Sequence, residues 1–232
     1  MPVIRVVTYN IQHGCDLAGS LDLNRCLREL ADLKPDIVAL QEIDRHRWST
    51  RLQDQVRFMA GKMGMRYAYG AVRNYRPGSY GNAILSRFPI QYTANHIMTP
   101  DTDRRCCLEA GILVGKTAVK VLAVHLGLKS ADRVQQVQTT IIPLVQGVEQ
   151  PYILAGDFNA SAGYREILIV KDNMEDSFAV NSGKEQNTFP SDRPTIRIDY
   201  IFTANCQAGD CRIISPACAS DHLPVLADIY LP

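Results

Sequence analysis

Short apolar runs, bounded by turn-forming and charged residues, recur along the whole chain. Their length of roughly four to eight residues and their content of Val, Ile, Leu and Tyr are typical of β-strands. Several runs carry no polar position on either face, which indicates strands that are covered on both sides. The predicted strands are Ile4–Tyr9, Asp36–Gln41, Ala83–Ser86, Ala110–Val114, Val119–Leu126, Tyr152–Ala155, Ile198–Phe202 and Val225–Tyr230.

Helical periodicity separates some of these strands. Leu23, Leu27 and Leu30 fall on one face of a helix, and similar spacing recurs in two later segments. The alternation of strands and helices predicts an α/β or α+β protein built on largely buried sheets. The predicted helices run from near Ser20 to Lys34-Pro35, over Asp54–Met63 before Gly64, and onward from the candidate N-cap Ser130, with Pro143 disturbing the later part of the third.

Polar side chains stand where several predicted strands end. Asn10 ends the first strand, Glu42 the second, and His125 interrupts the fifth near its end. Asp157 and Asn159 follow the sixth strand, and in an extended chain their side chains would share one face. Taken singly, these residues fit a cap, a surface charge, a core histidine and a turn. Their joint placement indicates that they converge at one rim of the sheets.

Composition is consistent with a single domain over 1–232, because 46% hydrophobic residues can build a full core and no linker or repeat divides the chain. No apolar run reaches the roughly 18 residues of a membrane span, and no secretory signal is visible. Seven cysteines without paired CxxC spacing favour reduced thiols and a cytoplasmic protein. The net charge of +1 provides no basic field, so a nucleic-acid substrate is possible but not favoured.

Seven short motifs add specificity because they occur in a characteristic order across nearly the whole chain. They are Thr8-Tyr9-Asn10-Ile11, Leu40-Gln41-Glu42, Gly81-Asn82-Ala83-Ile84-Leu85-Ser86-Arg87, Val124-His125-Leu126, Gly156-Asp157-Phe158-Asn159, Ile198-Asp199-Tyr200-Ile201 and Ser220-Asp221-His222-Leu223-Pro224. The ordered set resembles the endonuclease/exonuclease/phosphatase superfamily. The resemblance implies a DNase I-like, four-layer sandwich: two mostly antiparallel sheets packed face to face, helices outside, and an active site at one end.

The resemblance also implies a metal site. Glu42 is similar to the family's principal metal-binding carboxylate, and Asn10 and Asp221 would lie in or beside the metal shell. Ligation by a few oxygens, with positions left for water, suits Mg²⁺, with Mn²⁺ as a substitute.

The catalytic residues implied by the resemblance follow the later strands. Asp157 resembles the residue that orients or deprotonates the attacking water, and Asn159 would hold that water or a phosphate oxygen. His222 resembles the phosphate-contacting histidine, with Asp199 as its carboxylate partner. Such a carboxylate would favour the protonated ring, which could then donate to the charge that develops on phosphorus.

Three further assignments concern the substrate. His125 resembles a second phosphate-side histidine of several branches, and Asn82 would help to orient it. Arginines after the second strand and in later loops could grip another phosphate, although solvated surface charge is an equally good interpretation. Arg105, which precedes an apolar strand, is the first choice for a substrate contact. The adjacent Cys106 and Cys107 are interpreted as structural thiols rather than nucleophiles.

Departures from better-known branches narrow the substrate. Abasic-site endonucleases carry Trp-Arg-Leu-Asp where this chain has Ile196-Arg197-Ile198-Asp199, and the Trp-Cys-Asp-Arg pattern of inositol polyphosphate 5-phosphatases is absent. The sequence is most similar to compact bacterial hydrolases near the sphingomyelinase and lipid-remodelling branches. The leading hypothesis is therefore a Mg²⁺-dependent phosphodiesterase or phosphatase acting on a small or lipid-derived phosphoester. A DNA or RNA nuclease is the alternative, and a non-catalytic binding protein with this fold is a third.

Overall fold

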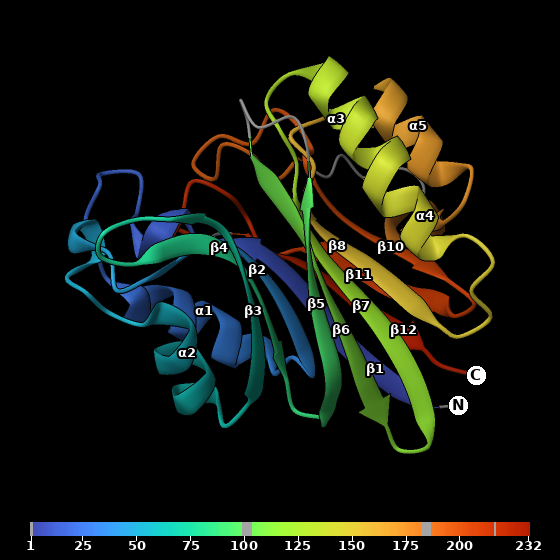
Figure 1. The fold of residues 1–232 in the computed structure, drawn as a ribbon, viewed down its shortest axis with the longest axis horizontal. Helices are drawn as coiled ribbons and strands as arrows, with labels where there is room; N and C mark the ends of the chain where they lie inside the picture. Colours follow the sequence, from blue (N-terminus) through green and yellow to red (C-terminus); the bar gives the residue numbers. More distant parts are fainter. Residues whose placement is uncertain (1, 99–103, 182–186, 216) are drawn as a thin grey trace.

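The computed structural model describes residues 2–98, 104–181, 187–215 and 217–232. Two six-stranded sheets are packed face to face, and Figure 1 shows helices on the outer face of each. The first sheet has the order β11 (Gln207–Ile213), β12 (Val225–Tyr230), β1 (Val3–Asn10), β2 (Ile37–Arg45), β4 (Ser79–Ser86), β3 (Arg66–Asn74). The second has the order β5 (Ile90–Met98), β6 (Arg105–Val114), β7 (Thr117–His125), β8 (Tyr152–Asp157), β10 (Asp199–Ala204), β9 (Glu175–Asp176).

The space between the sheets is filled by inward-facing aliphatic side chains. Val6 and Ile84 of the first sheet belong to the same buried cluster as Leu108, Val121 and Ile153 of the second. Each sheet also has apolar residues on its outer face, where the helices cover them. This explains the near-continuous apolar runs in the sequence, because strands covered on both faces need no polar alternation. The predicted four-layer sandwich is confirmed.

The helices begin and end for identifiable reasons. On the first sheet lie α1 (Leu23–Leu33), which begins after its N-cap Asp22, close to the start predicted near Ser20, and α2 (Gln55–Met63), which ends at Gly64 with φ +65°. The second sheet is covered by α3 (Ser130–Gln136), a π-turn (Val137–Ile141), α4 (Ile142–Val145) and α5 (Arg165–Lys171). Ser130 is not an N-cap as predicted: it is the first helical residue, and its hydroxyl donates to Glu166.

Several strands were absent from the prediction because they lack a long apolar run. β3 and β5 are edge strands with alternating or largely exposed positions, and β11 is mostly polar. The edges of β3 and β5 protect each other where the two sheets meet, because Asn95 donates from its side chain to the carbonyl of Ala71 at 2.9 Å. None of the helices in these ranges is long and apolar enough to cross a membrane.

The strand directions bring the polar strand ends together. β1 and β2 are parallel, so Asn10 lies beside Gln41 at the end of the first sheet. β7 and β8 are also parallel, and His125 pairs with Asp157 in the second sheet. On its other side, Asp157 pairs with Asp199 of antiparallel β10. One end of the sandwich therefore collects the polar side chains that terminate otherwise apolar strands.

A polar cluster around Glu109 on the second sheet contributes to the stability of the fold in a way that depends on pH. Glu109, which is 6% exposed, accepts hydrogen bonds from Tyr92 at 3.1 Å and lies 2.7 Å from His96 and 3.2 Å from Lys120. Burial disfavours its carboxylate, but these three partners outweigh burial and lower the pKa of Glu109 below 4.5. The resulting stability is present above that ordinary value and is lost as pH falls through the lowered pKa.

We expect Glu109→Gln to lower the free energy of unfolding by roughly 1–2 kcal/mol near neutral pH, because Lys120 and His96 lose a charged acceptor. The difference from wild type should shrink as the solution is acidified, and denaturant titration over a pH series would measure it. Glu149→Gln, at an exposed position, is the control. A difference that stayed constant into strong acid would show that the charge of Glu109 contributes nothing.

Candidate active site

The side-chain amide of Asn10 joins two carboxylates at the active-site end of the sandwich. Its Nδ2 donates to Oδ2 of Asp157 at 3.0 Å and lies 3.4 Å from Oε1 of Glu42. Asn10 is the last residue of β1 and is 1% exposed, so its position is fixed by the strand and by packing. The amide thus connects the first sheet to the second at the point where the predicted metal ligand and the predicted base meet.

Glu42 occupies an unusual backbone position. It was predicted to end the second strand, but β2 continues to Arg45 through a bulge between Leu40 and Ile43. Glu42 lies at this bulge with φ +58°, a left-handed conformation that is unfavourable for a residue other than glycine. The bulge turns the side chain toward the rim, where it keeps 21% of its surface exposed. Backbone strain of this kind is often found at functional positions.

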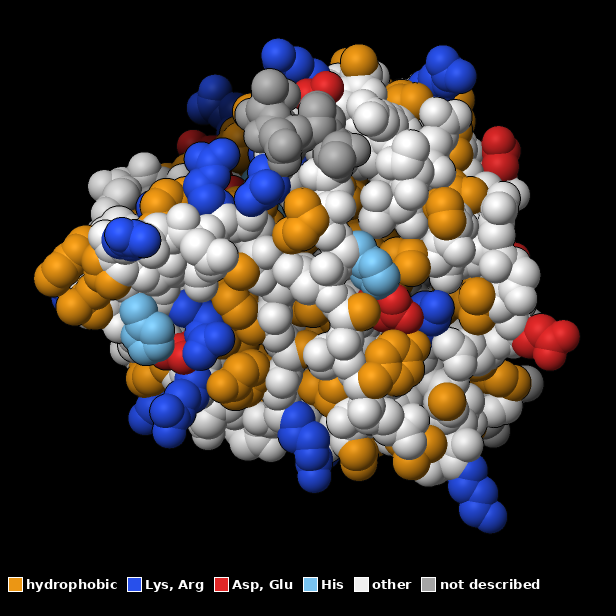
Figure 2. All heavy atoms as spheres, in the orientation of Figure 1, with side chains coloured by type: hydrophobic (Ala, Val, Ile, Leu, Met, Phe, Trp, Pro, Cys, Tyr) orange, Lys and Arg blue, Asp and Glu red, His pale blue; other side chains and the backbone are white. Residues whose placement is uncertain are grey.

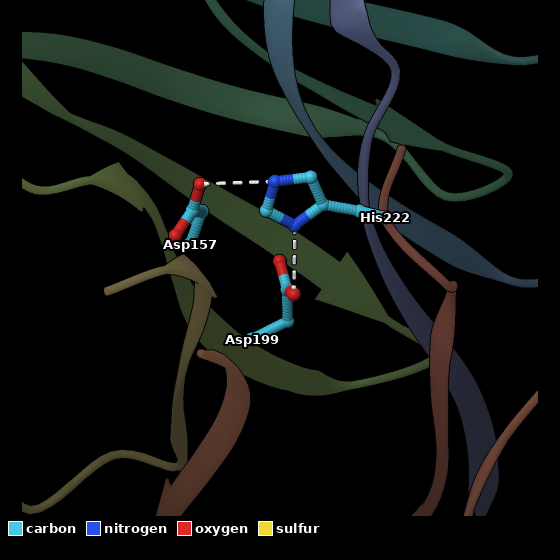
Figure 3. Close-up of side chains that lie close together, drawn as sticks. All are labelled: Asp157, Asp199 and His222. Atoms are coloured by element: carbon cyan, nitrogen blue, oxygen red, sulfur yellow. Dashed lines mark hydrogen bonds and ion pairs between the residues drawn. The ribbon is translucent and has the colours of Figure 1, made fainter. Parts of the chain in front are cut away.

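His222 and Asp199 form the predicted pair, as Figure 3 shows. Nδ1 of His222 lies 2.9 Å from Oδ2 of Asp199, and its Nε2 faces Oδ2 of Asp157 at 3.7 Å. Burial acts against a charged ring, but the carboxylates of Asp199, Asp157 and Asp221 outweigh it and raise the pKa of His222 to about 10. These carboxylates favour the protonated form of the ring, which lies between two buried acids.

Asp157 is buried at the end of β8 and is saturated with donors. Besides Asn10, it accepts the backbone N–H of Asn159 at 2.8 Å, and Nε2 of His125 lies 3.4 Å away. Burial is the main reason that the pKa of Asp157 rises to about 7, and the negative charge of Asp199 adds to it while His222 opposes it. A carboxyl group with this pKa can exchange a proton near neutral pH.

Asn159 does not reach the site by the predicted route. The chain stops being extended after Asp157, and Asn159 adopts φ +49° in a turn closed by the Asp157 carboxylate. The turn interpretation of this motif is therefore correct for the backbone. The Asn159 side chain donates to the carbonyl of Leu126 at 2.9 Å, which directs Nδ2 toward the loop after β7.

His125 differs from His222 in charge. Burial, followed by the positive charges of Arg105, His222 and His13, lowers the pKa of His125 well below its ordinary value. A neutral ring carries one proton, and the carboxylate of Asp157 favours that proton on Nε2. Nδ1 can then accept from the hydroxyl of Tyr80, which lies 3.3 Å away.

Asp221 is anchored through its neighbour. The hydroxyl of Ser220 donates to the carbonyl of Asn10 at 2.7 Å, and the backbone carbonyl of Asp221 accepts from Ser191 N–H at 2.7 Å. These bonds hold the Ser-Asp-His segment against the end of β1. The metal-ligand role of Asp221 stays a prediction, because these contacts place Ser220, and not the Asp221 carboxylate, against Asn10.

Two substrate predictions meet different outcomes. Asn82 is buried, and its amide donates to the carbonyls of Cys106 at 3.0 Å and Ala123 at 3.4 Å, so these contacts join the two sheets, and its role in orienting His125 stays a prediction. Arg105 is 8% exposed at the start of β6, and its charge lowers the pKa of His125, which places the guanidinium near the site. Burial raises the pKa of the Cys106 thiol to about 12, as expected of a structural cysteine.

Two of the arginines that follow Glu42, Arg45 at the end of β2 and Arg47 just after it, are accounted for by acids and rings. Arg45 pairs with Asp54 at 2.7 Å, and Arg47 pairs with Asp44 at 3.0 Å and covers the ring of Tyr75. The interpretation of balanced surface charge therefore holds for these two arginines, and a second phosphate grip from them is not supported.

His13 is a site residue that the prediction missed. Its Nε2 lies 3.2 Å from Oε2 of Glu42, and its Nδ1 lies 3.1 Å from Oδ1 of buried Asp44. Burial lowers the pKa of His13, but the bond with Asp44 and the charge of Glu42 outweigh this and raise it. His13 lies in the short 3₁₀ turn Gln12–Gly14 that follows β1. Hydrophobic periodicity cannot predict where the side chain of such a loop residue points.

Thr188 is a second missed residue. Its hydroxyl oxygen accepts the backbone N–H groups of Ile198 at 3.1 Å and Asp199 at 3.2 Å, and its carbonyl accepts Leu223 N–H at 2.8 Å. Thr188 thereby holds the two segments that carry Asp199 and His222 at a fixed separation. Because Thr188 lies in a loop far from both in sequence, local pattern gave no sign of this role.

Comparisons with known proteins agree with this architecture. A model of the endonuclease/exonuclease/phosphatase family matches residues 7–222. The uncharacterized protein YbhP of Escherichia coli K12 is 30% identical over 250 residues, covering 98% of this chain and 96% of YbhP. An endonuclease/exonuclease/phosphatase from Bacteroides vulgatus has a TM-score of 0.81 at 20% identity and covers 100% of both chains. The mannosyl-6-phosphatase of Bacteroides thetaiotaomicron has a TM-score of 0.76 at 17% identity, covering 98% of this chain and 100% of that one.

The opposite charge states of the two buried histidines can be measured. We expect ring ¹⁵N NMR of the metal-free protein to show His222 protonated at about pH 8 and His125 neutral. Asp199→Asn should lower the pKa of His222 by at least one unit, because its nearest carboxylate loses its charge. Asp176→Asn is the matched control at another buried carboxylate. Neutral His222 in the wild type at that pH would contradict the assignment.

Proposed function

The chain belongs to the endonuclease/exonuclease/phosphatase family, and we propose that it is a metal-dependent phosphoesterase that hydrolyses a small or lipid-derived phosphoester by in-line attack of water. Members of this family are hydrolytic phosphoesterases and nucleases. The observation that carries the proposal is the contact of Asn10 with both Asp157 and Glu42, because it places a candidate base beside a candidate metal ligand. A binding protein without turnover would have no need to hold this set together.

The residues present fit a hard divalent cation at Glu42. Its carboxylate is partly exposed, Asn10 lies beside it, and Asp221 would supply a further oxygen, a donor set typical of Mg²⁺ or Mn²⁺. A bound cation would supply Lewis-acid stabilisation of the phosphate charge. A different trio, Asp157, Asp199 and His222, has ligand atoms within 4.8 Å of one another. We favour the Glu42 set, because its carboxylate is partly exposed, whereas all three residues of the other trio are buried and Nδ1 of His222 is already engaged by Asp199.

The roles of the remaining residues follow from their charges. Asp157 would orient the attacking water and accept its proton, since its pKa of about 7 suits exchange near neutral pH. His222 would donate from Nε2 to the phosphate as charge develops, while Asp199 holds Nδ1 and keeps the ring protonated. Neutral His125 would orient Asp157, and Asn159 has its side-chain oxygen left for water or phosphate.

The class of substrate is inferred from the charged residues near the site and from the relatives in fold. Arg105 would contact the phosphate or a neighbouring anion, because its charge already reaches His125. The name of the mannosyl-6-phosphatase, a relative in fold, supports a small phosphoester for this chain as well. The net charge of +1 gives less support to a nuclease. Free thiols at all seven cysteines support a cytoplasmic, reducing location.

The metal proposal predicts that Glu42→Gln weakens Mg²⁺ binding by at least about tenfold, because a neutral amide replaces the anionic oxygen ligand. Isothermal titration calorimetry with Mg²⁺ and Mn²⁺ would measure the change without reference to turnover. Glu149→Gln, which removes an exposed carboxylate of the same type, should bind as the wild type does. Equal affinity in Glu42→Gln and wild type would exclude Glu42 as the ligand.

The catalytic proposal predicts hydrolysis of at least one phosphoester in a panel containing nitrophenyl phosphate mono- and diesters, sphingomyelin, supercoiled DNA and RNA, each with Mg²⁺ or Mn²⁺. Asp157→Asn should reduce that activity by roughly 10²–10⁴-fold at saturating metal, since positioned acid–base catalysis typically contributes that much. Asp172→Asn, an exposed control, should keep full activity. Activity of Asp157→Asn within about tenfold of wild type would remove the base role, and cleavage restricted to DNA or RNA would favour the nuclease.

A further inference from the structure

The two most exposed large hydrophobic side chains among the described residues lie on loops at the active-site end. Trp48 is 72% exposed in the loop after β2, and Leu128 is 70% exposed in the loop after β7. These strands also supply Glu42 and His125, so the loops flank the site. We propose that the active-site end of the protein docks on an anionic phospholipid surface through the exposed apolar side chains of these loops and the cations beside them.

The loop that carries Trp48 is held from inside the protein. Asp44 is fully buried, and its carboxylate accepts from Thr50 Oγ1 at 3.3 Å and from Arg47 at 3.0 Å. The turn Trp48–Thr50 is therefore fixed with the indole outside it. The indole takes no part in these bonds to Asp44, so folding does not explain why Trp48 is exposed. Its apolar surface in contact with water is unfavourable.

The loop that carries Leu128 is held in a similar way. Arg133 is 4% exposed, pairs with buried Glu166, and donates to the carbonyl of Leu128 at 2.6 Å. The same guanidinium lies 5.5 Å from the ring of Tyr164, which is 50% exposed in the loop after β8. A buried ion pair thus fixes two neighbouring loops so that a leucine and a tyrosine side chain project from them.

The charge of these loops complements an anionic surface. Loops 46–52, 126–130 and 158–165, together with the β3–β4 connection 74–79, contain no Asp or Glu. In Figure 2, Lys and Arg side chains lie along the left side of the molecule, where Figure 1 places the β3–β4 connection and the loop after β2. The net charge of the whole chain is only +1, so this concentration is local. The cations adjacent to exposed apolar side chains in these loops are Arg51 beside Leu52, Arg76 beside Tyr75, Lys129 beside Leu128, and Arg165 beside Tyr164, whereas Arg47, beside Trp48, is paired with Asp44.

Aliphatic tips favour lipid over nucleic acid. Aromatic and basic residues alone would also suit stacking against single-stranded bases. Leu128 and Leu52 offer no ring for stacking, whereas a leucine next to a cation suits the boundary between acyl chains and anionic headgroups. Docking would hold the active site against phosphoesters in the lipid surface, and this consequence rests on the proposed function. The docking proposal itself does not depend on hydrolysis.

Trp48 provides the measurement, because it is the only tryptophan of the chain. We expect its fluorescence to shift to the blue when the full protein is mixed with vesicles of phosphatidylcholine and phosphatidylglycerol in equal parts, and the protein to co-sediment with them. Raised salt should weaken the binding, because exposed charges are screened. Leu128→Ser should weaken vesicle binding by roughly tenfold, through loss of one buried leucine, while hydrolysis of a water-soluble phosphoester is unchanged.

Matched variants distinguish binding through this surface from non-specific binding to vesicles. Tyr164→Ser should weaken binding, whereas Tyr67→Ser, at the opposite end of the sandwich, and Val3→Ser should not. Asp157→Asn should bind vesicles as the wild type does, so binding supports the docking surface even if no hydrolysis is found. Equal binding to pure phosphatidylcholine, an unshifted Trp48 emission, or a Trp48 response to single-stranded oligonucleotide without one to vesicles would each overturn the proposal.

Discussion

Two carboxylates, Asp157 and Asp199, lie in a site from which water is largely excluded, and their repulsion has to be offset before the sandwich can close. His222 stands between them and bonds directly to Oδ2 of Asp199. Burial alone would make both acids neutral and the ring uncharged. The mutual presence of the three groups produces a protonated histidine and an acid that titrates near neutral pH. The charge distribution therefore belongs to the trio and to no residue singly.

The architecture supplies this trio from two sheets. A parallel pair in each sheet directs the ends of β1 and β2, and of β7 and β8, to the same end of the sandwich. Asn10 then connects the sheets, and Thr188 fixes the separation of β10, which carries Asp199, from the loop segment that carries His222. Backbone hydrogen bonds and buried packing thus hold the polar groups in place before any ligand binds.

Much of this was readable from the sequence, and the reasons differ between fold and site. Strands buried on both faces leave long apolar runs, so the central strands were predicted, whereas edge strands such as β3 and β5 were not. The pairing of Asp199 with His222 followed from a family resemblance, and the structure places the two side chains in contact. His13, Thr188 and the bulge at Glu42 were missed because each depends on contacts or backbone angles that only the folded chain defines.

The bulge at Glu42 has a consequence for how the sequence can vary. At φ +58° a glycine would suit the backbone better than glutamate, by about 1 kcal/mol in the usual case. Selection for stability alone would therefore favour glycine at this position. A carboxylate retained against that gradient indicates that what position 42 contributes is not folding. Among relatives with the same bulge, the residue at this position should separate chains that still use the site from those that have kept only the scaffold.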